Sequence, residues 1–295
     1  MIVRVLLKEL ETQLRASPVL AESGENASLD REARELLSTV MNITLGAVSQ
    51  RGESVVDAAT TARAIAVVQR RALGEPLAYA LASASFRYLT LYVDRRVLIP
   101  RPETEIVVDE ALNAMHGRTG GIAVDIGTGS GAIALSLASE GRFDRVIATD
   151  VSPDALAVAE LNVARLVPPH APVEFRLGAD LSPLAGIKAC LIVSNPPYIA
   201  LDEASSLPAS VRDWEPALAL FADDGGMARY DLLLASAADY LEPGGWLVLE
   251  VDARRAGETA RRAIRTGKFT GVRLVRDLAG RDRVLVAQAT TISLR

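Results

Sequence analysis

One short run of the sequence, Asn195-Pro196-Pro197-Tyr198, combines an amide, two prolines and a phenol in a pattern suited to chemistry. It follows an apolar segment at 191–194 that reads as a buried strand, and open α/β sheets bind ligands at the carboxyl ends of their strands. Each proline fixes φ at roughly −65° and lacks a backbone donor, so the corner is rigid and its carbonyl groups remain free to accept. The side-chain oxygen of Asn195 and the carbonyl of Pro196 can each accept one N–H of a planar NH₂ group, while Tyr198 stacks on that group. We therefore expect catalysis by orienting an amide or amino nitrogen, without a strong base.

A glycine-rich turn forms a second group with functional potential. It follows a buried-strand pattern at 122–126, precedes a helical pattern at 132–135, and consists of Gly127, Thr128, Gly129, Ser130 and Gly131, with Asp125 two residues ahead. Glycines lack the β-carbon that would keep a ligand away from the backbone, and they adopt positive φ at little steric cost. The turn is therefore expected to bind a cofactor.

The spacing of the turn and the acid that follows it indicate which cofactor this is. Asp150 ends the next predicted strand, about twenty residues on, where a carboxylate can accept both hydroxyl protons of a ribose. The turn reads G-x-G-x-G, and it lacks the G-x-G-x-x-G spacing that supports a pyrophosphate at a helix N-terminus. These features favour S-adenosylmethionine, which has a ribose and an adenine but no phosphate.

Alternating strand and helix patterns are expected to position both groups. Strands are predicted near 121–126, 145–149, 172–177, 189–194 and 246–251, and helices near 103–115, 131–140, 153–166, 227–241 and 253–266. Two further β-rich runs, at 269–276 and 282–288, are predicted to complete the sheet as a terminal hairpin. This order is typical of a parallel sheet flanked by helices, an α/β fold.

The N-terminal part of the chain follows a different period. Residues 1–80 read as a small helical bundle, with apolar side chains at helical spacing in Ala33, Leu36, Leu37, Val40 and Met41. Between 86 and 99 the pattern becomes β-rich, with a turn predicted at Asp94-Arg95 and hence a hairpin. We therefore predict a helical domain at 1–84, a β-hairpin linker at 85–100 and a catalytic domain at 101–295.

Composition excludes several classes of protein. Of 295 residues, 49% are hydrophobic and 23% are charged, with 32 basic and 37 acidic side chains giving a net charge of −5, which suits a globular protein rather than a disordered one. A single cysteine, Cys190, and two histidines predict neither a disulfide nor a metal site. No apolar stretch approaches the roughly 18 residues of a membrane span, so we expect a cytoplasmic protein.

One local charge excess leaves two interpretations open. Residues 254–283 carry ten Arg or Lys and three Asp or Glu. Such a run is either a solvated helix face, which we favour, or a docking patch for an anionic partner.

Taken together, these motifs resemble the bacterial release-factor glutamine methyltransferases. The resemblance rests on the turn at 125–131, Asp150, the Asn-Pro-Pro-Tyr run at 195–198 and the segment Leu98-Ile99-Pro100-Arg101-Pro102-Glu103-Thr104-Glu105. Asn-Pro-Pro-Tyr alone is shared with amino methyltransferases of DNA and RNA, whereas the proline-arginine-proline-acid segment resembles this family in particular. The resemblance extends from about residue 30 to residue 288.

The resemblance implies a class I S-adenosylmethionine-dependent methyltransferase with a Rossmann-like, seven-stranded sheet, preceded by a helical bundle that docks the substrate protein. The implied reaction transfers methyl to the side-chain amide of the glutamine in the Gly-Gly-Gln loop of peptide chain release factors. The turn residues and Asp150 would hold the cofactor, with Asp180 and Leu181 beside its adenine and Asn195 reaching both cofactor and substrate. Pro196, Pro197 and Tyr198 would receive the glutamine. We expect a monomer that binds release factors, with no membrane partner and no nucleic acid.

The sequence departs from this family at several positions. Leu181 stands where the family usually has an aromatic residue, and the segment after Glu250, at 251–255, lacks the family's glycine and glutamine. These departures leave the chemistry intact and concern the docking of the substrate. Two other functions remain open: an amino methyltransferase that acts on RNA or DNA bases through the same Asn-Pro-Pro-Tyr motif, and a non-catalytic cofactor-binding protein. The first would need a basic or aromatic recognition module, and residues 1–85, with nine basic and ten acidic groups, do not supply one.

Overall fold

The computed structural model describes residues 1–22, 28–166 and 171–290. The chain divides into two compact units: unit 1 comprises residues 1–84 and 205–215, and unit 2 comprises residues 85–204 and 216–295. The sequence-based division assigned 205–215 to the catalytic domain, whereas the structure groups this segment with the helices. Among the described residues, no helix is both long enough and apolar enough to cross a membrane.

Unit 1 is helical, as its apolar spacing predicts. Its helices are α1 (Val3–Arg15), α2 (Pro18–Glu22), α3 (Leu29–Met41), α4 (Leu45–Gln50), α5 (Ala58–Ala72), α6 (Leu77–Leu81) and α10 (Ala209–Arg212). The core combines apolar faces of α1, α3 and α5, and it includes the predicted stripe residues Ala33, Leu36, Leu37 and Val40, with Met41 partly buried against them. The side chain of Asp57 accepts the Thr60 N–H at 2.8 Å and so begins α5.

A mixed seven-stranded sheet forms the centre of unit 2. Its strands are β3 (Ile122–Ile126), β4 (Arg145–Asp150), β5 (Val173–Leu177), β6 (Ala189–Ser194), β7 (Leu241–Glu250), β8 (Phe269–Arg276) and β9 (Asp282–Ala289). Their order is β5-β4-β3-β6-β7-β9-β8. The first five strands run parallel, and β9 is antiparallel to both β7 and β8. The seven-stranded, Rossmann-like α/β fold is thereby confirmed.

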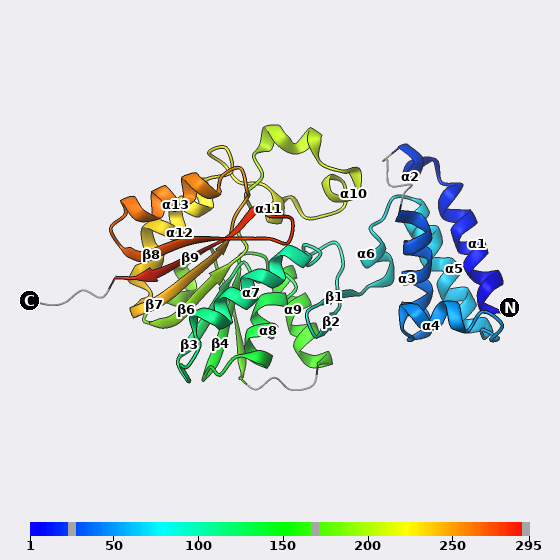
Figure 1. Ribbon diagram of the computed structural model, residues 1–295, viewed down its shortest axis with the longest axis horizontal. Coiled ribbons are helices and arrows are strands. Elements are labelled where there is room, and N and C mark those ends of the chain that lie inside the picture. Colours follow the sequence, from blue (N-terminus) through cyan, green and yellow to red (C-terminus); the bar gives the residue numbers. More distant parts are fainter. Residues whose placement is uncertain (23–27, 167–170, 291–295) are drawn as a thin grey trace, which may run out of the picture. The chain divides into compact units, whose positions relative to one another are not determined.

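Helices cover both faces of this sheet (Figure 1). Along β3, Ala123 packs into one apolar cluster with α7 (Pro102–Ala114) and α8 (Ala132–Glu140), against which α9 (Pro153–Arg165) also packs. The neighbouring Val124 packs into the second cluster, with α12 (Ala228–Ser236) and α13 (Ala256–Arg265). This alternation is expected of strands that are buried on both faces. The remaining short elements are η2 (Ser182–Leu184), η3 (Leu201–Ser206), α11 (Ala217–Leu220) and η4 (Ala237–Asp239).

The linker contains a hairpin, but the strands that pair are not the predicted ones. The paired strands are β1 (Ala84–Phe86) and β2 (Leu89–Leu91), so the hairpin reverses at Arg87. The predicted turn at Asp94-Arg95 is present, with the Val97 N–H donating to the Asp94 carbonyl at 3.1 Å, but residues 97–99 do not form the predicted strand. Arg87 adopts a φ of 52°, which side-chain-bearing residues rarely adopt. Its guanidinium pairs with Asp109 and Glu140, both at 2.7 Å, and these tertiary contacts hold the conformation. A local sequence pattern carries no signal for such a turn.

Candidate active site

The two groups singled out in the sequence lie next to each other in the sheet. β3 and β6 are parallel neighbours, with Ile126 opposite Ser194, and the Ser194 hydroxyl donates to the Ile126 carbonyl at 2.7 Å. The glycine turn begins at the residue after Ile126, and Asn195 is the residue after Ser194. Here the strand order reverses, since β4 lies on one side of β3 and β6 on the other. Such a switch point is where open α/β sheets bind ligands.

Three glycines give the turn its shape, and two of them leave room for a ligand. Gly127 and Gly129 have φ values of 73° and 54°, both line the cavity, and a Cβ built on either would meet no protein atom within 4 Å. Gly131, with a φ of 85°, has a packing role instead. A Cβ there would lie 3.1 Å from Leu135 Cδ1 and 3.3 Å from Ala159 Cβ, so glycine lets α8 and α9 approach the turn.

Asp150 connects the end of β4 to the turn. One of its carboxylate oxygens accepts the Gly129 N–H at 2.9 Å, and the other accepts the Ser152 N–H, also at 2.9 Å. Each oxygen keeps a second lone pair, and Asp150 lines the cavity. The carboxylate is thereby fixed with acceptor capacity for two adjacent hydroxyl groups, as on a ribose.

The replacement Asp150→Asn is expected to weaken binding of S-adenosylmethionine about tenfold, the equivalent of one hydrogen bond to a charged group. The amide NH₂ must face either Gly129 or Ser152, both of which donate to the carboxylate in the native chain. Isothermal titration calorimetry with the cofactor measures this loss directly. Asp154→Asn, on the neighbouring exposed turn of α9, is the matched control. Equal cofactor affinities of Asp150→Asn and the native chain would contradict the assigned ribose contact.

Asp125 lies beneath the turn and shapes it from inside. Its side chain is fully buried, and one oxygen accepts from the Thr128 hydroxyl at 2.7 Å and the Ala134 N–H at 3.1 Å. The other oxygen has no hydrogen-bond partner among the described residues. Burial raises the pKa of Asp125 to about 7.

A relay of three side chains fixes the orientation of the Asn195 amide. The Thr104 hydroxyl, on α7, donates to the carboxylate of Glu250 at 2.6 Å, while Asn195 Nδ2 donates to the Thr104 oxygen at 3.2 Å. A hydroxyl has a single proton, so a threonine that donates to Glu250 can only accept from Asn195. The amide NH₂ of Asn195 is thus directed at Thr104, and its oxygen stays available as an acceptor. Asn195 lines the cavity, so that oxygen can receive an N–H donor there.

Glu250 at the end of β7 controls this relay through its charge. Burial raises the pKa of Glu250 to about 7, opposed by the Thr104 hydrogen bond and by the positive charge of Arg283, while Glu103 raises it further and Arg101 lowers it. When ionised, the carboxylate only accepts, which forces the orientation described above. When protonated, it becomes a donor, and Thr104 can then donate to an Asn195 amide turned the other way.

The rate of methyl transfer, kcat, is therefore expected to rise with pH through about 7, because the ionised form of Glu250 holds the productive orientation. Single-turnover rates between about pH 5.5 and 8.5 measure this ascending limb. In Glu250→Gln the limb should vanish, leaving a rate that is low at every pH. Asp125 titrates in the same range, so an ascending limb that persists in Glu250→Gln would assign the pH dependence to another group.

Most of the predicted site residues line one cavity. The lining includes Gly127, Thr128, Gly129, Ser130, Asp150, Asp180, Asn195, Pro196 and Pro197. Asp125 and Gly131 support the turn from behind. Leu181 is buried in the core of unit 2, so it does not replace the missing aromatic residue beside a ligand. Tyr198 also lies outside the lining; its ring packs partly against the same core, and burial raises its pKa to about 12.

Two residues at the site, Arg229 and Asn162, have no distinct signal in the sequence. Asp180 lines the cavity, but its carboxylate is paired with Arg229 of α12 at 2.8 Å, and Arg229 also lines the cavity. Asn162 of α9 donates to the Ser130 carbonyl at 2.8 Å and to that of Tyr92 at 3.0 Å, which ties the turn to the segment after β2. Thr104 lies in the proline-rich segment at 98–105, but its hydrogen bond to Asn195 has no signal in the sequence.

Comparisons of sequence and structure relate this chain to known proteins. Residues 106–209 match the methyltransferase small domain family, and residues 11–81 match the PrmC N-terminal domain family. A release factor glutamine methyltransferase from Moorella thermoacetica is 40% identical over 256 residues, which cover 87% of this chain and 90% of that protein. A protein of the same name from Xylella fastidiosa is 36% identical over 273 residues, covering 92% and 98%. A crystal structure of a methyltransferase from Pyrococcus furiosus superposes with a TM-score of 0.52 at 20% identity, covering 68% of this chain and 89% of that one, and it supports the fold alone.

Proposed function

Since this chain belongs to the family of release factor glutamine methyltransferases, we propose that its substrate is the glutamine in the Gly-Gly-Gln loop of peptide chain release factors. The chain is an S-adenosylmethionine-dependent methyltransferase by family and fold. The proposed reaction places the methyl group on the side-chain amide nitrogen of that glutamine.

The observation that carries this proposal is the fixed amide of Asn195. Its NH₂ is committed to Thr104, so its oxygen is an acceptor beside the glycine turn. A primary amide has two N–H donors and a nitrogen lone pair delocalised into its carbonyl, which makes it a poor nucleophile. Two acceptors, the Asn195 oxygen and the Pro196 carbonyl, suit the two N–H groups of such a substrate. Hydrogen bonds of this kind hold the nitrogen in place and favour the build-up of positive charge on it.

The residues around the turn fit the cofactor. Gly127 and Gly129 leave open space where a side chain would intrude, and Asp150 presents oxygens suited to a ribose diol. S-adenosylmethionine, when bound, supplies a methyl group on a sulfonium that leaves as a neutral thioether. The chain's own part is to aim the substrate nitrogen at that methyl and to accept its N–H groups. One amide proton is then lost from the methylated nitrogen to solvent. Because no step needs a strong base, the absence of a histidine among the described residues that line the cavity is compatible with the reaction.

The helical unit is proposed to dock the release factor. Unit 1 contributes none of the residues that line the cavity, and its match to the PrmC N-terminal domain supports a role apart from chemistry. The active form is proposed to be a monomer. Because release factors act on ribosomes, the proposed location is the cytoplasm.

The alternative function, methylation of RNA or DNA bases, was supported mainly by the excess of basic residues at 254–283, and the structure weakens that support. All ten basic residues in 254–283 pair with carboxylates, several of them far away in sequence, such as Glu110 for Arg273 and Asp231 for Arg262. Paired cations present a much weaker field to phosphates than the sequence count suggests. This stretch is therefore best explained as a solvated, ion-paired surface, the interpretation favoured from the sequence.

Mass spectrometry of a purified release factor, incubated with the full chain and S-adenosylmethionine, tests the proposal. We expect one added methyl group on the loop glutamine and none on a release factor in which that glutamine is replaced. Duplex DNA and ribosomal RNA, incubated in parallel with labelled cofactor, are the competing substrates. Label in nucleic acid together with an unmodified release factor would refute the proposal.

A further inference from the structure

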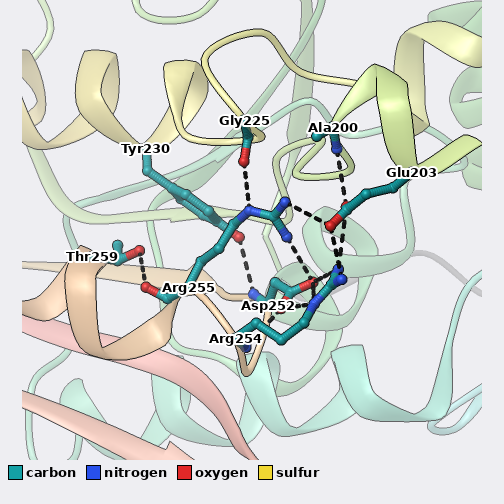
Figure 2. Close-up of polar contacts among 8 residues, drawn as sticks. All are labelled: Ala200, Glu203, Gly225, Tyr230, Asp252, Arg254, Arg255 and Thr259. Atoms are coloured by element: carbon teal, nitrogen blue, oxygen red, sulfur yellow. Dashed lines mark hydrogen bonds and ion pairs between the residues drawn. The ribbon is translucent and has the colours of Figure 1, made fainter.

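Residues 251–255, which follow β7, differ from the usual sequence of the family at this place. In the structure, three of them take part in a network of ion pairs. Asp252, Arg254 and Arg255 form an ion-paired network with Glu203, which belongs to η3, the segment that follows the Asn-Pro-Pro-Tyr corner (Figure 2). None of the four lines the cavity. Whatever they contribute to catalysis is therefore indirect.

Arg255 is the central residue of this network. Its guanidinium donates from Nε to the Gly225 carbonyl at 2.7 Å, from Nη1 to Asp252 at 3.2 Å and from Nη2 to Glu203 at 3.1 Å (Figure 2). The side chain is only 12% exposed. Three segments of unit 2 are thereby joined by one rigid planar fork, which a lysine ammonium cannot reproduce.

Arg254 contacts the same two carboxylates but in a different environment. It donates to Glu203 at 2.8 Å and to Asp252 at 2.7 Å, while 63% of its side chain is exposed. Exposed ion pairs are weakened by water and salt and contribute little. Arg254 is therefore a matched internal control for Arg255.

The network contacts the backbone at the end of the Asn-Pro-Pro-Tyr corner. Gly226 has a φ of 85°, and a Cβ there would lie 2.2 Å from the Tyr198 carbonyl oxygen and 2.8 Å from Arg255 Nε. The turn that Arg255 holds at Gly225 is thus packed against Tyr198 with no space between them. On the other side, the Glu203 carboxylate accepts the Ala200 N–H at 3.2 Å.

We propose that Arg255, together with Asp252 and Glu203, forms a positioning cluster that sets where the Tyr198–Ala200 backbone lies and so aligns the acceptor corner for the protein substrate. The proposal rests on the proposed function for its kinetic consequences. Arg255 holds the Gly225–Gly226 turn against Tyr198, and Glu203 holds the amide of Ala200, so the backbone that follows Pro197 is restrained at both Tyr198 and Ala200. Loss of either restraint lets Asn195 and Pro196 shift relative to the glycine turn, and displacements of about 1 Å are costly in catalysis.

The test compares Arg255→Lys with Arg254→Lys in the full-length chain. Arg255→Lys should lower kcat for release factor methylation about tenfold or more, with an unchanged Kd for S-adenosylmethionine by calorimetry. Arg254→Lys should stay within about twofold of the native kcat. Hydrogen–deuterium exchange should be faster at 198–204 and 222–226 in Arg255→Lys only, with no change at 127–131. A purely structural role would instead lower the melting temperature and disturb cofactor binding as well.

If Arg255→Lys does not fold, Glu203→Ala provides the same test, because it removes the acceptor of the Ala200 N–H. The same increase in exchange at 198–204 is expected. Native exchange at 198–204 in either folded variant, or equal losses of kcat in the Arg254 and Arg255 variants, would overturn the positioning role. The exchange measurement needs no turnover. A native chain that leaves release factors unmodified would therefore refute the proposed function, while exchange at 198–204 would still decide whether the cluster restrains the corner.

Discussion

Asn195→Ala is expected to lower kcat by about 100- to 1000-fold, or roughly 2–4 kcal/mol in the barrier, which is the cost of losing one preorganised hydrogen-bond acceptor. The alanine retains the Pro196 carbonyl, so the substrate amide is held by one acceptor instead of two. Affinity for S-adenosylmethionine should change much less, because Asp150 and the glycine turn are untouched. Rapid-quench measurement of methyl transfer under single-turnover conditions, with calorimetry for the cofactor, separates the two effects.

The companion variant Asn195→Asp sharpens this test. An aspartate keeps an oxygen at the same place but has no N–H to give to Thr104, whose proton already goes to Glu250. It also brings a second carboxylate toward a buried one. We therefore expect Asn195→Asp to be nearly as slow as Asn195→Ala. A chain that only binds the cofactor without catalysis would show no turnover in any form. Native kcat in Asn195→Ala would refute the role of the Asn195 oxygen, and native kcat in Asn195→Asp would refute the need for the hydrogen bond from Asn195 to Thr104.

Thr104→Val is expected to lower both the rate of methyl transfer and the stability of the fold. Valine preserves the shape of threonine but leaves the Glu250 carboxyl without its donor and the Asn195 NH₂ without its acceptor. We expect kcat to fall about 10- to 100-fold and the free energy of unfolding to fall by about 1–3 kcal/mol. Urea denaturation and single-turnover kinetics measure the two quantities on the same protein.

Thr104→Ser is the matched control, since it keeps the hydroxyl and should retain most of the native rate. In a double-mutant cycle, Thr104→Val should add little to kcat once Asn195 is alanine, because the threonine acts only through that amide. Independent, additive losses would mean that Thr104 contributes to the reaction by another route.

The strands and helices of unit 2 were predictable because their signals are local. Buried strands such as β3 and β6 are mainly apolar, and glycine or the proline corner marks where each ends. Parallel neighbours meet at the same edge of a sheet, so the pairing of the glycine turn with Asn195 also followed from the pattern. The observed bounds of β4 and α9 differ from the predicted ones by a residue at most.

What the sequence did not reveal depends on residues far apart in the chain. Thr104 and Glu250 are 146 positions apart and meet only because α7 packs beside the end of β7. The turn at Arg87 relies on carboxylates from two helices and has none of the glycine or asparagine that marks a left-handed turn. Tyr198 and Leu181 were assigned to the ligand by motif, yet their apolar surfaces are partly or wholly buried in the core. A motif gives the chemistry of a side chain but not the direction in which it points.

The division of unit 1 into two stretches of sequence has a consequence for biosynthesis. Residues 205–215 belong to the helical unit, and Trp214 lies close to the backbone of Gly74, where a Cβ would be 3.8 Å from its indole nitrogen. The apolar core of unit 1 is built from residues between Val3 and Leu81, so a nascent chain can form this core before residues 205–215 have been translated. An expression fragment that stops at residue 84 would keep that core and lose only the later segment that packs at Gly74.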